Sequence, residues 1–116
     1  MGWAKDLLEE MRAPGRELRE RIPGVYAGFV AIDHAGMPDG ALTEKVKQLI
    51  ALAIAVTREC DGCVASHAKA AAKAGANEAE VAEALGVAIQ MNGGPGTVWG
   101  PRAFAAFKEF ADPSQK

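Results

Sequence analysis

Apolar residues recur along the chain at intervals of three and four, with polar residues between them. This spacing is that of one face of an α-helix, and no long segment alternates with the period of two that strands require. Ala, Leu, Glu and Lys, which favour helices, are abundant. The pattern therefore predicts an all-α protein of about six to seven helices.

Proline and glycine divide the N-terminal part into three predicted helices. The first runs from Trp3 to Arg12 and is expected to stop at Pro14-Gly15. A second, shorter helix is expected to end before Pro23-Gly24. The apolar segment Val25 to Ala35 predicts the third, and the composition of Gly36 to Gly40 predicts a loop.

The middle of the chain predicts two helices joined by a tight junction. Leu49 to Val56, "LIALAIAV", is apolar on every side and indicates a central, buried helix, which Thr43 can cap. The next helix is expected to follow a break at Asp61-Gly62. Gly75, which suits a left-handed cap, is expected to end it.

Two further helices complete the expected fold. Asn77 and Glu80 resemble a capping box, and the segment Asn92 to Gly96 ends or kinks the helix that they start. Pro101 suits the first turn of the last helix. That helix carries three phenylalanines at intervals of three, which with Trp99 indicate packing and in part a subunit interface: Phe104, Phe107 and Phe110.

Length and charge narrow the class of protein. A chain of 116 residues suits one domain over 1–116, with N-terminal helices in 1–41, a core region in 42–92 and a C-terminal helix in 97–111. The net charge of −2 gives no basic surface for nucleic acid. No apolar run is long enough for a membrane, and the start lacks the pattern of a signal peptide, so a cytoplasmic protein is expected.

The segment "RECDGCVASHA" holds the only two cysteines, Cys60 and Cys63, and a histidine, His67. On a helix that begins near Cys60, all three side chains share one face. The positive end of the helix dipole lowers the pKa of a cysteine, and the thiolate is the nucleophile. The pattern predicts a reactive sulfur, a second sulfur to resolve it and an imidazole to move a proton. Such a site suits peroxide reduction or disulfide exchange.

Two other interpretations of these residues remain open. A zinc site would need a fourth ligand when closed, and His34 is the only other histidine. That residue also suits the negative end of a helix dipole. Alternatively, both cysteines are small core residues, because free cysteine is among the most buried residue types. The protein would then be a non-catalytic or metal-holding helical module.

The segment from Leu42 to Ala84 resembles the carboxymuconolactone decarboxylase family, and within it the AhpD-like alkylhydroperoxidase branch. The resemblance rests on a Lys-containing helix, an apolar stretch, Cys-x-x-Cys-x-x-x-His, and an Ala-rich helix that ends in Gly. The segment Met91 to Gly96, "MNGGPG", is similar to a Gly-Gly-Pro element of many small members.

This resemblance implies an AhpD-like helical bundle that assembles as a homo-oligomer, a trimer or hexamer, with active sites near subunit contacts. It implies reduction of a small peroxide without metal, flavin or other cofactor, and recycling by a lipoyl-bearing or thioredoxin-like reductant. Cys63 would attack the peroxide. Cys60, nearer solvent, would resolve it by forming a disulfide and would meet the reductant. His67 would belong to the proton relay.

One residue departs from the family pattern. The relay carboxylate of the family stands twelve residues before the first cysteine, where this chain has Gln48. A glutamine cannot act as a base, although it can orient His67. Glu44, one turn earlier on the same helix, and Glu59, next to the cysteine pair, are possible substitutes in the relay.

The family name raises a further alternative, decarboxylation of a small acidic lactone. That reaction needs cationic groups to hold carboxylates, and a base. Arg58 and Arg102 can bind an anion, although a surface role is the default for each. The cysteine pair favours the redox branch.

Overall fold

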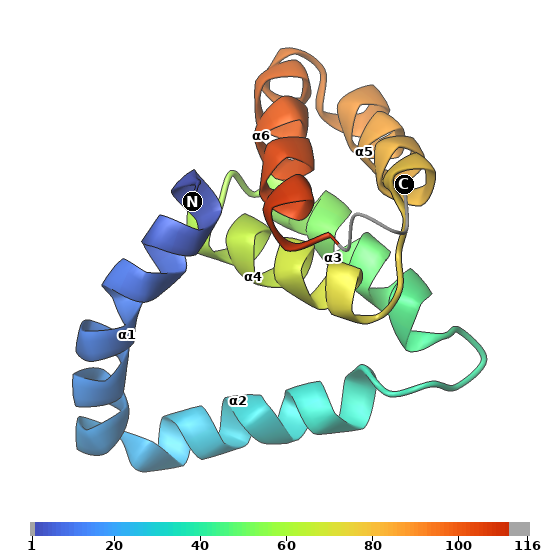
Figure 1. Ribbon diagram of the computed structural model, residues 1–116. Coiled ribbons are helices and arrows are strands. Elements are labelled where there is room, and N and C mark those ends of the chain that lie inside the picture. Colours follow the sequence, from blue (N-terminus) through green and yellow to red (C-terminus); the bar gives the residue numbers. More distant parts are fainter. Residues whose placement is uncertain (1, 112–116) are drawn as a thin grey trace.

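The computed structural model describes residues 2–111, which form six α-helices and no strand (Figure 1). The prediction of an all-α protein is therefore confirmed. The two ends of the predicted domain, residue 1 and residues 112–116, lie outside the described range. The helices are α1 (Trp3–Arg21), α2 (Pro23–Gly36), α3 (Glu44–Thr57), α4 (Asp61–Lys73), α5 (Glu78–Asn92) and α6 (Gly94–Phe110).

Helices α3 to α6 pack together into the body of the molecule (Figure 1). Small residues let the helices approach closely, and a Cβ added at Gly96 would lie 2.9 Å from the Cα of Ile89. That contact fixes the packing of α6 on α5. The largest fully buried side chains come from all four helices: Leu52, Val56, Val64, Val81 and Phe107.

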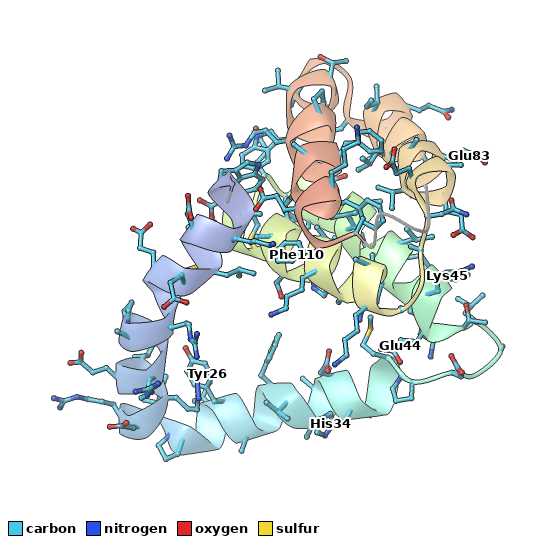
Figure 2. The ribbon with its side chains drawn as sticks, viewed as in Figure 1. Tyr26, His34, Glu44, Lys45, Glu83 and Phe110 are labelled. Atoms are coloured by element: carbon cyan, nitrogen blue, oxygen red, sulfur yellow. A yellow bond between two sulfur atoms is a disulfide. The ribbon has the colours of Figure 1, made fainter. Side chains whose placement is uncertain are left out.

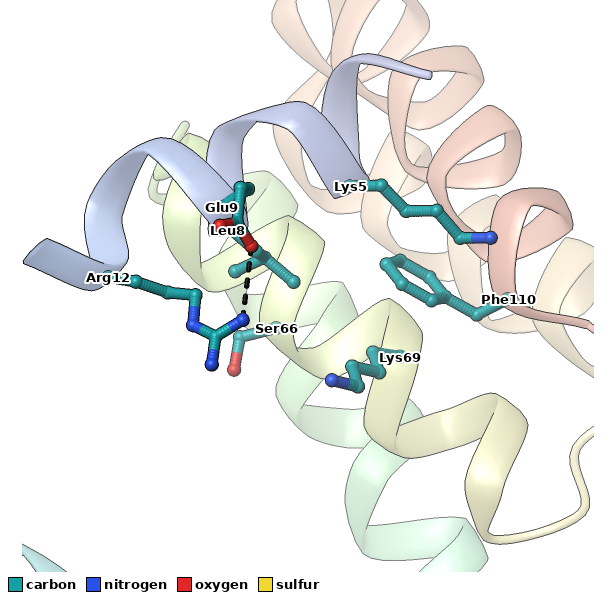
Figure 3. Close-up of a pocket in the computed structure, with 7 residues that line it drawn as sticks. All are labelled: Lys5, Leu8, Glu9, Arg12, Ser66, Lys69 and Phe110. Carbon is teal, nitrogen blue, oxygen red and sulfur yellow. Dashed lines mark hydrogen bonds and ion pairs between the residues drawn. The ribbon is translucent and has the colours of Figure 1, made fainter. Parts of the chain in front are cut away.

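Helix α1 packs against α4 and α6, and the carboxylate of Glu109 on α6 caps its first turn. That carboxylate accepts hydrogen bonds from the backbone N–H groups of Ala4 and Lys5, at 3.0 and 2.9 Å. Farther along α1, a cavity of about 770 Å³ opens against α4 (Figure 3). It is lined by Lys5, Leu8, Glu9, Arg12, Ser66, Lys69 and Phe110.

The prediction that Pro14-Gly15 stops the first helix is wrong, because α1 continues through both residues to Arg21. Proline lacks an N–H group, which leaves the carbonyl of Glu10 without its helical partner. Both Glu10 and Pro14 are exposed, so water can satisfy that carbonyl. The proline at 23 does mark a new helix, since it is the first residue of α2.

The start of the last helix also differs from the prediction. Helix α6 begins at Gly94, and Pro101 lies inside it rather than in its first turn. Pro95 occupies the first turn, where a missing N–H costs nothing. At Pro101 the carbonyl that loses its partner belongs to Thr97, and both residues are exposed.

The predicted caps are confirmed. The hydroxyl of Thr43 accepts from the N–H of Val46 at 3.2 Å at the start of α3. Asn77 and Glu80 form the reciprocal capping box of α5, with hydrogen bonds of 3.0 and 2.8 Å. Gly75 adopts a left-handed conformation after α4, with φ of 93°.

Helix α2 stands apart from the body, between α1 and the loop before α3 (Figures 1 and 2). It has no buried residue, although it is apolar, and Phe29 and Ile32 are 70% and 71% exposed. His34 lies in its last turn, as the dipole interpretation expects. The ammonium group of Lys47 donates to the carbonyls of Gly36 and Pro38, which joins the end of α2 to α3.

The expectation that α3 is buried on all sides is wrong for the single chain. Its inner face carries Leu52 and Val56, but Ile50 and Ile54 are 44% and 56% exposed. None of the helices described over residues 2–111 is both long and apolar enough to cross a membrane.

Candidate dithiol site

The chain reverses direction between α3 and α4 in a turn that places the first cysteine. Arg58 is the C-cap of α3, and Glu59 follows in a left-handed conformation with φ of 53°. The N–H of Glu59 donates to the carbonyl of Val56 at 3.0 Å, and the N–H of Cys60 donates to that of Ala55 at 3.2 Å. These two bonds form a Schellman motif. Its geometry makes Cys60 the N-cap of α4.

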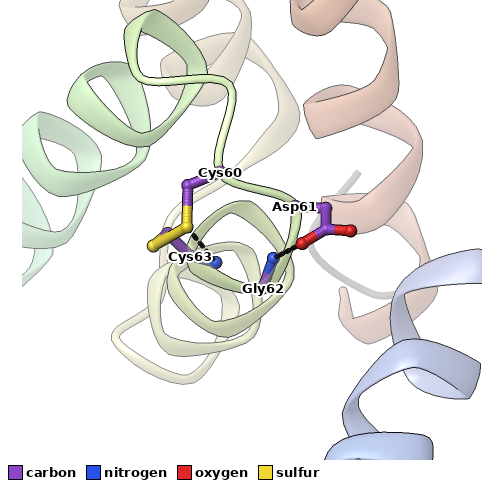
Figure 4. Close-up of a disulfide and its surroundings, with 4 residues drawn as sticks. All are labelled: Cys60, Asp61, Gly62 and Cys63. Atoms are coloured by element: carbon purple, nitrogen blue, oxygen red, sulfur yellow. Dashed lines mark hydrogen bonds between the residues drawn. A yellow bond between two sulfur atoms is a disulfide. The ribbon is translucent and has the colours of Figure 1, made fainter.

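The two cysteines form a disulfide at the start of α4 (Figure 4). The sulfur atoms are 2.07 Å apart, and the Sγ atom of Cys60 accepts a hydrogen bond from the N–H of Cys63 at 3.3 Å. The carboxylate of Asp61 accepts from the N–H of Gly62 at 2.6 Å. The first turn of α4 therefore directs a backbone donor at sulfur, as the interpretation of a helix-start thiol predicts.

The exposure of the two cysteines reverses one expectation. In the single chain Cys63 is exposed and Cys60 is half-buried, so the prediction that Cys60 lies nearer solvent is wrong for this chain. Cys60 belongs to the turn that ends α3, where its N–H donates to the carbonyl of Ala55, whereas Cys63 lies in the first turn of α4.

His67 lies one helical turn after Cys63 and contacts α3 through Gln48. The Nδ1 atom of His67 is 2.8 Å from Oε1 of Gln48, which is only 6% exposed. With the amide oxygen as acceptor, Nδ1 carries the proton and Nε2 holds the free lone pair. Burial lowers the pKa of His67 below 6.5, and the carboxylate of Asp33 on α2 partly opposes that shift. The imidazole is therefore neutral at pH 7.

A cavity of about 460 Å³ opens beside the disulfide. Side chains at the end of α3 and in the first turns of α4 form its wall, and they include both cysteines and the histidine. The lining residues are Ala51, Ile54, Ala55, Arg58, Cys60, Cys63 and His67. The larger cavity between α1 and α4 has no sulfur or imidazole in its lining. Of these two cavities, the smaller one is therefore the candidate site, because the disulfide and the imidazole both line it.

The structure separates the three candidate relay residues. Gln48 contacts His67, but Glu44 lies in the first turn of α3, where its N–H donates to the carboxylate of Asp39 at 2.7 Å. Glu44 lines a different cavity, together with Gly75 at the far end of α4. Glu59 is exposed and is absent from the lining of the disulfide cavity. Neither glutamate lines the cavity that holds the disulfide and His67.

Sequence reasoning missed one carboxylate that acts on the site. Asp33 of α2 raises the pKa of His67, although the two residues are far apart in the sequence. No motif marks this position, because the effect depends on where α2 lies relative to α4.

Arg102, which the sequence offered as an anion-binding residue, does not line the disulfide cavity. Its guanidinium group lies over the rings of Trp3 and Trp99, at 4.2 and 5.0 Å from their centroids. It therefore serves packing between α1 and α6.

In residues 2–111, no three side chains among His, Cys, Asp and Glu converge as a metal site would require. The two sulfurs that a zinc ion would need are bonded to each other. In this oxidised form neither is a thiolate ligand.

The fold and the site define a class of helical proteins with a cysteine pair at a helix start and a histidine one turn later. The chain belongs to the carboxymuconolactone decarboxylase family, whose model matches residues 23–110. Its Cys-x-x-Cys-x-x-x-His motif is compatible with the AhpD-like branch.

Two sequence relatives and one solved structure align with most of the chain. The chain is 36% identical over 103 residues to an uncharacterised protein of Cupriavidus necator. The aligned region covers 89% of this chain and 91% of the relative. It is 36% identical over 81 residues to uncharacterised protein 4 in the cox locus of Paracoccus denitrificans, covering 70% and 73% of the two chains. The crystal structure of apo-lpg0406, a carboxymuconolactone decarboxylase family protein from Legionella pneumophila, superimposes with a TM-score of 0.90 at 34% identity, covering 94% and 97%.

Proposed function

We propose that this protein is an AhpD-like thiol-dependent oxidoreductase that cycles between a Cys60–Cys63 disulfide and a dithiol. The observation that carries the proposal is the disulfide at the N-terminus of α4, in one cavity with His67. A cysteine pair in a cytoplasmic protein is more often chemically active than structural, and a cytoplasmic location is part of the proposal.

In the reductive half of the cycle, a dithiol such as a lipoyl group or a thioredoxin-like protein attacks the disulfide. Cys63 is the more exposed of the two residues and receives the attacking thiolate. Cys60 leaves as a thiolate, which the N–H of Cys63 and the helix dipole stabilise. The second thiol of the reductant then displaces Cys63 and closes its own disulfide. Two electrons pass from the reductant to the cysteine pair.

In the oxidative half, the thiolate of Cys63 attacks one oxygen of a small peroxide. The O–O bond breaks, an alcohol leaves with a proton, and Cys63 becomes a sulfenic acid. Cys60 then attacks that sulfur, water leaves with a second proton, and the disulfide returns. The neutral imidazole of His67 suits the transfer of these protons, because its Nε2 is free to accept one.

The absence of a carboxylate at position 48 favours slow peroxide turnover. A missing general base costs on the order of 100-fold in proton transfer. Disulfide exchange needs no such base once the thiolate is formed, so we propose that thiol exchange is the faster of the two half-reactions.

The test is a thiol count through one full cycle. Reduced protein should show two reactive thiols that disappear together on addition of cumene hydroperoxide and return on addition of dihydrolipoamide. Cys60→Ser should still lose its remaining thiol to peroxide, whereas Cys63→Ser should react with peroxide far more slowly. A pair of thiols that peroxide and mild disulfide reagents leave unchanged would overturn the proposal.

We further propose that the chain assembles as a homo-oligomer, a trimer or hexamer. Support comes from the apolar surface that the single chain leaves in solvent on α2 and α3, including Phe29, Ile32 and Ile50. An uncovered apolar surface of this kind is typical of a subunit contact.

A further inference from the structure

One positively charged side chain, that of Arg58, lines the disulfide cavity. Most of the wall is apolar, formed by Ala51, Ile54 and Ala55, and His67 is neutral there at pH 7. Arg58 is the only side chain with a formal charge in the lining. A molecule that enters the cavity therefore meets an apolar wall, a disulfide and a guanidinium group.

No carboxylate neutralises this arginine within residues 2–111. The ion pairs of the described chain join Arg12 to Glu9 and Lys45 to Glu80. The two acidic residues nearest in the sequence are Glu59, which does not line the cavity, and Asp61, whose carboxylate accepts from the N–H of Gly62. The five donors of a guanidinium group suit a carboxylate in a paired, planar contact.

The backbone holds Arg58 at a fixed place relative to the sulfurs. Its N–H donates to the carbonyl of Ile54 at 2.9 Å, and the Schellman motif that follows connects it to Cys60, two residues later. The structure contains the oxidised pair. The cavity is therefore the one that a reductant, rather than a peroxide, encounters.

We propose that Arg58 binds the carboxylate of a small dithiol acid that reduces the Cys60–Cys63 disulfide. The inference rests on the proposed function and specifies the class of reductant: a short apolar dithiol with a free carboxylate, such as dihydrolipoate. The step is the exchange already described, in which the reductant loses two electrons and two protons and closes a cyclic disulfide. The cysteine pair gains both and becomes two thiols.

An arginine at a helix C-terminus also interacts favourably with the helix dipole. That role alone would leave the reaction indifferent to the charge of the reductant. A comparison of two reductants that differ only in charge separates the two roles.

Dihydrolipoate and dihydrolipoamide provide this comparison, because they share the same dithiol and chain and differ in a carboxylate or an amide. The measurement is the second-order rate constant for reduction of the oxidised protein at pH 7. We expect wild type to react about threefold to tenfold faster with dihydrolipoate, and this preference to shrink in 0.5 M NaCl.

Three variants test whether the preference for dihydrolipoate depends on Arg58. Arg58→Gln should lose it, Arg58→Lys should keep most of it, and Arg21→Gln, which removes an exposed arginine at the end of α1, should keep all of it. Equal rates with the two dithiols in wild type, or an undiminished preference in Arg58→Gln, would overturn the inference and leave the proposed function intact. Failure of both dithiols to reduce the disulfide would instead overturn the proposed function, and the inference with it.

Discussion

At the scale of single residues, the contact between His67 and Gln48 sets the tautomer of the imidazole, with the proton on Nδ1. The amide is buried and uncharged, so it orients the imidazole without stabilising a positive charge on it. Burial then lowers the pKa of His67 below 6.5, and the histidine remains a free base through neutral pH. A glutamate at position 48 would change this balance, because a carboxylate favours the charged imidazolium.

Gln48→Glu should raise the pKa of His67, since an opposite charge in direct contact favours the protonated imidazolium. The wild-type imidazole should titrate below pH 6.5, and the variant imidazole at a higher pH than that of wild type. An NMR titration in a His34→Gln background measures both values. If the carboxylate also restores a relay, peroxide turnover should rise by about 10-fold to 100-fold.

Gln48→Met is the matched control, because it keeps the volume of the side chain and removes the hydrogen bond. It should lower peroxide turnover without raising the pKa of His67. A peroxide rate that is the same in Gln48→Glu and wild type would mean that position 48 takes no part in the relay.

At the scale of elements, the chain uses the same helix ending twice with different residues. Helices α3 and α4 both end in a Schellman motif, with Glu59 and Gly75 at the left-handed position. In the second motif the N–H of Gly75 donates to the carbonyl of Ala72 at 3.1 Å, and that of Ala76 donates to Ala71 at 3.0 Å. Glycine adopts this conformation freely, whereas a residue with a Cβ is strained by about 1–2 kcal/mol.

Substitutions at these two positions should therefore change the free energy of unfolding in opposite directions. Glu59→Gly should raise the free energy of unfolding by about 0.5–1 kcal/mol, and Gly75→Ala should lower it by about 1 kcal/mol. No side chain lies within 4 Å of a Cβ at Gly75, so its cost is one of backbone conformation alone. Urea denaturation of the oxidised proteins measures both. Two changes of the same sign would contradict the assignment of strain to Glu59.

At the scale of the whole molecule, α2 is the feature that the single chain leaves unexplained. A helix of 14 residues is marginal in water by itself, and α2 buries none of its residues on this chain. Packing against another copy would cover its apolar side chains. It would also bring further groups near the disulfide cavity, because Asp33 of the same helix already acts on His67.

Phe29→Asp should therefore weaken assembly. Light scattering should give wild type a mass three or six times that of the 12.1 kDa chain, and the variant a smaller mass. Ala13→Asp, which adds the same charge at an exposed position of α1, should leave the mass unchanged. A wild-type mass of one chain at every concentration would rule out the oligomer.

The features that the sequence predicted well are those that depend on neighbours three or four residues away. The Thr43 cap, the Asn77–Glu80 capping box and the left-handed Gly75 each involve contacts within one turn. The cysteine pair at the start of α4 belongs to the same group. By contrast, Pro14 was expected to end a helix, and only its exposure on α1 explains why the helix continues.

By itself the sequence determined the helical class, the caps and the place of the cysteine pair at the start of a helix, because turn geometry acts within a few residues. Only the tertiary structure decided which relay candidate meets His67. Gln48 lies 19 residues away and contacts it because α3 packs against α4, while Glu44 on the same helix lies at the far end. The exposure of Cys63 was decided in the same way, since it depends on how α4 packs against the rest of the molecule.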